Sequence, residues 1–144
     1  MNALLKPPPG MARLKSGAIV VDQRLRTLFK VNAADLGEAV QGGGTQRERL
    51  DRAQAALTRL SAGWVPDDKE LRSAPVLKAW VVHGSPPHFF FAGSVTGHPL
   101  ILDGRWCVTS PVIAYDGLLG GWIRTVSRWY RLGRPFRTGD QESQ

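Results

Sequence analysis

The dipeptide Asp103-Gly104 constrains the fold more than any other feature of this chain, because it stands between two runs rich in apolar residues. Asp-Gly is among the residue pairs best suited to the two-residue type I′ turn that joins antiparallel strands. The run His88–Leu102 precedes the turn, and the run Arg105–Tyr115 follows it. We therefore predict a β-hairpin at the centre of the domain, with apolar side chains on both of its faces.

The register of that hairpin places His98 and Cys107 on one face as diagonal neighbours. A cysteine beside a histidine can act as a nucleophile. A lone cysteine in a strand is more often a small buried hydrophobic residue. We therefore assign no catalytic residue, and keep a Cys-His enzyme only as a third hypothesis.

Helical signals stand mainly in the first half of the chain. Thr45 and Glu48 have the spacing of a capping box, in which each side chain bonds the other residue's backbone N–H. Apolar residues then recur every three or four positions, and Gly63 is suited to end the helix. We also predict helices over Val21–Val31 and Ala33–Val40, and a short one from Asp67 to Ser73.

The segment Trp122–Leu132 fits either a strand or a helix. A strand would mix apolar and basic side chains on one face. A helix collects the aromatic residues on one face and aligns the basic ones on another, and Gly133 suits its C-terminal end. We therefore predict an amphipathic helix that carries Arg124, Arg128 and Arg131 in a stripe.

These elements together predict an α+β fold: N-terminal helices, a small antiparallel β-meander and a C-terminal amphipathic helix. A small SH3-like or OB-like barrel with appended helices is the alternative. The length of 144 residues suits one domain. We expect that domain over residues 18–135, between flexible tails at residues 1–17 and 136–144.

The charge distribution indicates the kind of partner. The formal net charge is +7, and the excess of basic residues lies in the two flanks of the chain. Basic surfaces attract phosphate-rich partners, and a guanidinium can donate two parallel hydrogen bonds to a phosphate. Our leading hypothesis is a non-enzymatic basic binding module that contacts nucleic-acid phosphates through Arg124, Arg128, Arg131 and Arg134. The alternative is an accessory protein that docks through these arginines on an acidic protein partner.

Several other classes of site find no support in the sequence. The spacing of His83, His88 and His98 matches no metal-ligand pattern. The glycines 42–44 lack the strand and the lysine of a phosphate-binding loop. We expect no metal, no cofactor and no membrane span, since no apolar run reaches about 18 residues. With Cys107 as its single cysteine, the chain can form no internal disulfide, and we expect a cytoplasmic protein.

Three short motifs resemble a small family of uncharacterised bacterial proteins. They are Gly97-His98-Pro99 followed by Asp103-Gly104, then Thr109-Ser110-Pro111-Val112, and finally Arg124-Thr125-x-Ser127-Arg128-x-Tyr130-Arg131-Leu132-Gly133. The resemblance covers residues 64–133. It implies a bacterial origin and one compact domain. It implies no catalytic or binding residue, because that family has no established function.

Overall fold

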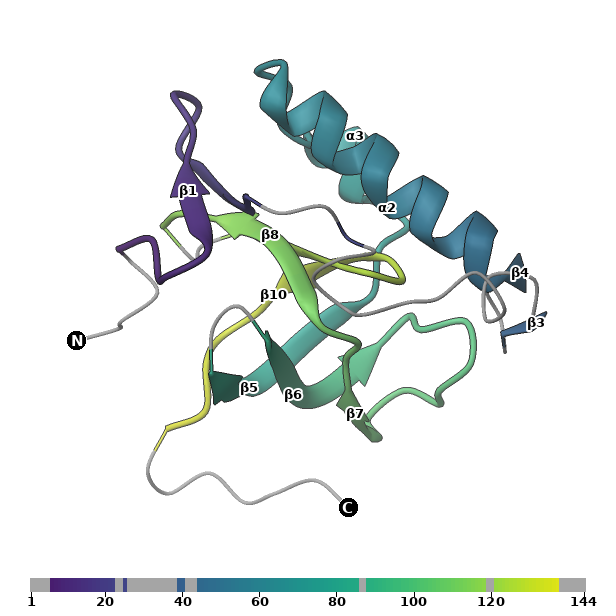
Figure 1. Ribbon diagram of the computed structural model, residues 1–144. Helices are drawn as coiled ribbons and strands as arrows, with labels where there is room; N and C mark the ends of the chain where they lie inside the picture. The colour runs from purple at the N-terminus through teal and green to yellow at the C-terminus, as the bar shows by residue number, and fades with distance from the viewer. Residues whose placement is uncertain are drawn as a thin grey trace.

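Most of the described chain is one strongly curved sheet (Figure 1). The computed structural model describes residues 6–22, 25, 39–40, 44–85, 88–118 and 121–137. Eight strands of these residues form a mixed sheet in the order β1-β2-β8-β9-β10-β5-β6-β7. They are β1 (Met11–Arg13), β2 (Ala18–Val21), β5 (Val76–Ser85), β6 (His88–Thr96), β7 (Trp106–Val108), β8 (Val112–Asp116), β9 (Trp122–Thr125) and β10 (Trp129–Leu132). A separate pair joins β3 (Ala39–Val40) to β4 (Gly44–Thr45).

The pairing within the large sheet is antiparallel except between β10 and β5, which run parallel. β1, which pairs with β2, lies in the segment that we expected to be an N-terminal tail. The bulk of the core comes from strands, because β2, β8 and β9 are buried along almost their whole length.

Helix α2 (Gln46–Ser61) lies along one side of the sheet (Figure 1). Its capping box is confirmed: Thr45 Oγ1 accepts from Glu48 N, and Glu48 Oε1 accepts from Thr45 N, both at 3.1 Å. The apolar stripe of α2 is buried in the core and consists of Leu50, Ala53, Leu57 and Leu60. The short predicted helix is present as α3 (Asp68–Leu71), capped by Asp67.

The prediction of a C-terminal helix is wrong. Residues 122–132 form β9 and β10, which pair antiparallel. The Thr125 side chain holds the turn between them, accepting from Ser127 N and Arg128 N at 3.1 Å each and donating to Arg128 O. All four residues of β9 are buried. A strand covered on both faces need not alternate between apolar and polar residues, which explains why the pattern misled the prediction.

The expected α+β fold of N-terminal helices, a small meander and a C-terminal helix is therefore wrong. The small-barrel alternative fails as well, because the structure is mostly an eight-stranded mixed sheet, with little helix among the described residues. Of the predicted helix Val21–Val31, Val21 belongs to β2, Asp22 lies in neither a strand nor a helix, and Leu25 is helical; the rest lies outside the described residues. The predicted helix Ala33–Val40 also lies outside them, except for the strand residues 39–40.

A turn at Asp103-Gly104 is present, but it is not the predicted type I′ turn, because Asp103 does not have the positive φ that this type requires. The hairpin around it differs from the prediction as well. Arg105 N donates to Leu102 O at 3.1 Å, and Gly104 has φ +86°. β6 nevertheless ends at Thr96, and its partner β7 begins only at Trp106. The connection between these strands is a loop, not the continuation of a two-residue hairpin.

Two residues of the 97–105 loop explain this difference. Gly97 turns the chain out of the strand with φ +80°, and its N–H donates to Asp103 Oδ1 at 2.8 Å. Pro99 has no N–H to donate to a neighbouring strand. A two-residue turn at 103–104 would pair Cys107 with Leu100, but Cys107 pairs with Gly93. The predicted register is therefore wrong.

Candidate anion-binding site

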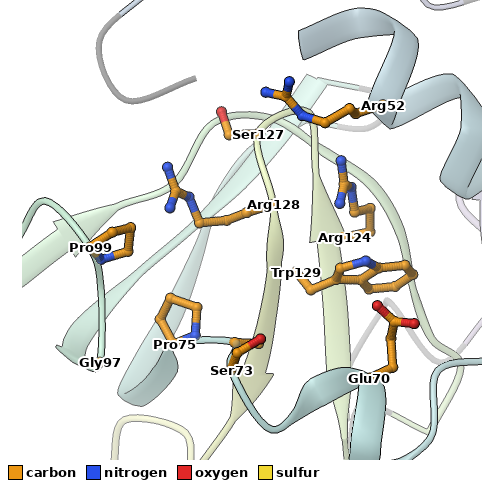
Figure 2. Close-up of a pocket in the computed structure, with 11 residues that line it drawn as sticks. Arg52, Glu70, Ser73, Pro75, Gly97, Pro99, Arg124, Ser127, Arg128 and Trp129 are labelled. Atoms are coloured by element: carbon orange, nitrogen blue, oxygen red, sulfur yellow. The ribbon is translucent and has the colours of Figure 1, made fainter. Parts of the chain in front are cut away.

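A pocket of about 320 Å³ lies where α2, the β9–β10 turn, the segment after α3 and the loop after β6 meet (Figure 2). We call it the arginine pocket. It is lined by Arg52, Glu70, Ser73, Ala74, Pro75, Gly97, Pro99, Arg124, Ser127, Arg128 and Trp129. Three guanidinium groups thus face one carboxylate. Glu70 is shared with a cation outside the pocket, since its Oε1 lies 3.7 Å from Arg59 Nη1.

The three arginines come from three different parts of the fold. Arg52 lies on α2, Arg124 on β9 and Arg128 in the turn before β10. Figure 2 shows their guanidinium groups gathered toward one end of the pocket, with Ser127 near them and with Glu70 and Ser73 toward the other end. The pocket therefore has a cationic end that the fold assembles from distant segments.

Arg124 is the most constrained of these cations. It is 7% exposed, and its Nε is the one buried side-chain nitrogen or oxygen among the described residues that has no hydrogen-bond partner. Burial, followed by the charges of Arg52 and Arg128, lowers the pKa of Arg124 to about 10. The group still carries its charge at neutral pH. A buried, charged donor without a partner is unfavourable, and an anion in the pocket would relieve it.

The cationic end is built on a hydrogen-bonded support. Arg49 Nε on α2 donates to Ser127 Oγ at 2.9 Å, which ties the β9–β10 turn to the helix. Ser110 Oγ donates to Ser127 Oγ at 3.0 Å and accepts from Ser127 N at 3.2 Å. Burial lowers the pKa of Arg49, with smaller contributions from Arg128 and Arg52. These bonds hold the turn in place although the charges of Arg49, Arg52 and Arg128 repel one another.

Trp129, which belongs to a cluster of aromatic rings, forms one wall of the arginine pocket. The ring of Trp129 meets Trp64 and Trp122 at steep angles, with centroid distances of 5.7 and 5.4 Å. The Arg124 guanidinium carbon lies 5.4 Å from the centroid of Trp129, a distance at which a cation is attracted to the ring. Arg59 lies over Trp64 at 3.7 Å. Trp129 is thus packed against two other rings, and its own ring partly compensates the buried charge of Arg124.

The structure brings together two of the four arginines that the sequence indicated. Arg124 and Arg128 both line the arginine pocket. Arg131 does not, because its Nε and Nη2 donate to the Ala74 carbonyl oxygen at 3.2 and 3.0 Å. Arg134 is exposed beyond the end of β10. The predicted stripe depended on helical periodicity, and a strand pair places these side chains differently.

Sequence reasoning missed the arginines of α2 as members of the site. Arg49 and Arg52 lie off the buried apolar stripe of their helix. The one indication in the sequence is that both arginines lie on the polar side of an amphipathic helix. Nothing in the local sequence indicates that this side meets the β9–β10 turn.

His98 and Cys107 are related through Tyr130. Cys107 Sγ lies 3.9 Å from Tyr130 Oη, and the His98 ring lies 6.1 Å from the Tyr130 ring. Burial raises the pKa of the Cys107 thiol. His98 Nδ1 accepts from Leu100 N at 3.0 Å, and within the described part of the chain no hydrogen bond joins His98 to Cys107. The thiol thus has no base to activate it in this arrangement.

Among the described residues, no three His, Cys, Asp or Glu side chains lie close enough together to hold a metal ion. No helix formed by these residues is long and apolar enough to cross a membrane.

The fold and the site define a small domain that consists mainly of a mixed sheet and contains the arginine pocket. The chain belongs to a family of unknown function, DUF6634, which matches residues 43–143. This confirms the expected membership of an uncharacterised family, and the match includes every residue that lines the arginine pocket. Comparison with curated proteins finds no match. Comparison with solved structures finds none either.

Proposed function

We propose that this protein is a non-enzymatic binding module that binds the phosphate groups of nucleic acid in the arginine pocket. The observation that supports this most strongly is the buried charge of Arg124, whose Nε has no hydrogen-bond partner. Arg52 and Arg128 add two further cations close enough to influence its pKa. The mutual repulsion of these cations is unfavourable, and an anion between them would reduce it.

A phosphate fits this arrangement better than a carboxylate does. Guanidinium groups form charge-assisted, often paired hydrogen bonds with phosphate oxygens. Phosphate also offers more acceptor oxygens than a carboxylate, which matters where three guanidinium groups line one pocket.

The surroundings of the pocket favour a polyanionic ligand. The net charge is +7, and α2 exposes Arg47, Arg52 and Arg59 to solvent. A nucleic acid would gain from this charge through the release of its counterions. We place this function in the cytoplasm, which agrees with the single buried Cys107.

The test is fluorescence anisotropy with a labelled oligonucleotide over a range of salt concentrations. We expect binding at low salt that weakens steeply as salt rises, because each phosphate contact adds to the slope. Arg128→Gln removes a half-buried cation and should weaken binding about tenfold. Lys15→Gln, at the exposed turn between β1 and β2, removes the same charge away from the pocket residues and is the matched control. No binding at low salt, or an equal loss in both variants, would contradict the proposal.

An acidic protein partner is the second candidate. It is favoured by an exposed apolar patch on the loop whose Gly97 and Pro99 line the pocket. Leu100 and Leu102 of that loop are 50% and 74% exposed. Competition of an acidic peptide against the oligonucleotide separates the two candidates, because a protein partner predicts that the peptide wins.

A further inference from the structure

The depth at which Arg124 lies restricts the kind of phosphate that can reach it. We infer that the arginine pocket takes a terminal phosphate monoester of a nucleic-acid strand and not an internal phosphodiester. This inference rests on the phosphate-binding function proposed above and names the part of the ligand that the pocket recognises.

The restricted access to the Arg124 guanidinium favours a terminal phosphate. Arg124 is 7% exposed, so an anion can reach its guanidinium only by entering the pocket. Pro75 and Pro99 line one side, and Trp129 lines another (Figure 2). An internal diester has a chain leaving in two directions, and both would have to pass these walls. A terminal phosphate has a single attachment and can enter with its free oxygens leading.

The positive charge of the pocket also favours a monoester over a diester. A phosphate monoester carries about 1.5 to 2 negative charges at neutral pH, whereas a diester carries one. The pocket holds the guanidinium groups of Arg52, Arg124 and Arg128. Arg52 and Arg128 both lower the pKa of Arg124, so the three charges repel one another. The more highly charged anion relieves more of this repulsion.

The basic side of α2 favours a nucleic acid as the carrier of the monoester. Arg52 lines the pocket and is also exposed, and Arg47 is exposed further toward the N-terminus of α2. A nucleic-acid strand that leaves the pocket along this helix would place its next phosphates near basic side chains. A phosphorylated peptide or a small phosphorylated metabolite would gain nothing from them.

The experiment compares three forms of one short single-stranded oligonucleotide: 5′-phosphorylated, 3′-phosphorylated and unphosphorylated. With the full chain, we expect a phosphorylated end to bind about tenfold more tightly or better than the unphosphorylated strand. This preference should shrink as the pH falls through about 6, where the phosphate loses its second charge. Arg124→Gln should abolish the preference, and Arg128→Gln should reduce it. Arg47→Gln should weaken all three forms equally, because it lies outside the pocket.

The other outcomes distinguish a failure of this inference from a failure of the proposed function, and identify other classes of ligand. Equal affinity for the three strands would overturn the inference and leave the proposed function standing, whereas no affinity for any of them would overturn both. Inorganic phosphate or glucose 6-phosphate binding as tightly as the phosphorylated strand would show that the ligand is a small phosphate. Tighter binding of a phosphoserine peptide would show a protein ligand. If Arg124→Gln fails to fold, an undiminished preference in Arg128→Gln overturns the inference.

Discussion

Replacing Arg124 with methionine is expected to make the protein more stable and to remove its affinity for the anion. Arg124 is 7% exposed, and its Nε has no hydrogen-bond partner. Methionine is flexible enough to fill the same space without a charge. One substitution should therefore move stability and binding in opposite directions, as expected where a fold holds an unfavourable group for its ligand.

The magnitude follows from the electrostatics of the pocket. Burial, followed by the neighbouring Arg52 and Arg128, lowers the pKa of Arg124 to about 10. At about 1.4 kcal/mol for each pKa unit below the ordinary value of arginine, holding this charge costs the folded state about 3 to 4 kcal/mol. The cost is fully present at neutral pH, which is below the folded pKa, since a lowered pKa means that folding disfavours the protonated form. Loss of the attraction to Trp129 offsets about 1 kcal/mol. We expect a net gain of about 2 to 3 kcal/mol.

The assay is urea denaturation followed by tryptophan fluorescence, with Tm measured in parallel. A gain of about 2 to 3 kcal/mol should raise Tm by about 7 to 10 °C in a chain of this size. Added phosphate ligand should raise the Tm of the unmodified protein and leave that of Arg124→Met unchanged, because only a folded state that binds is stabilised. Arg124→Lys keeps a buried charge and should show no gain in stability. An Arg124→Met protein destabilised by more than about 1 kcal/mol would refute the reasoning, because losing an unpaired buried charge should not destabilise the fold.

Three further predictions concern other parts of the fold. Thr45→Ala removes the capping box of α2 and should lower the free energy of unfolding by about 1 kcal/mol; an unchanged urea midpoint would contradict it. Ala79 in β5 has φ +51°, so Ala79→Gly should gain up to about 1 kcal/mol, and a loss in the same assay would argue against strain there. Burial and Arg128 lower the pKa of His98, so protonation disfavours the folded state. The free energy of unfolding should be highest, as far as His98 determines it, above about pH 6.5 and should fall as the pH drops below that value. His98→Gln should flatten this decline in Tm, and an unaltered pH profile would show that His98 is not its source.

Local features of the sequence predicted local structure correctly. The Thr45 and Glu48 capping box and the apolar stripe that follows it depend on residues a few positions apart, and α2 forms as they indicate. The turn at Asp103-Gly104 also forms where the dipeptide predicts it. The strands around that turn could not be predicted, because Gly97 and Pro99 end the pairing before the chain reaches it.

Residues 122–132 show why the sheet itself was missed. Their spacing fits a helix as well as a strand, and propensity decides little when a segment is covered on both faces. β9 is buried along its whole length between β8 and β10. β10 in turn pairs with β5, which lies far away in the sequence. Only these distant partners select the strand.

The sequence by itself determined the chemistry that this protein can offer: a positive net charge of +7, carried mainly by arginine, and a polar side of α2 rich in the same residue. It also indicated Arg124 and Arg128. Only the tertiary structure decided that these two meet Arg52 in one pocket and that Arg124 is buried there without a partner for its Nε. The physical reason is that side-chain type is a local property, whereas burial and the approach of like charges are set by long-range strand pairing and helix packing.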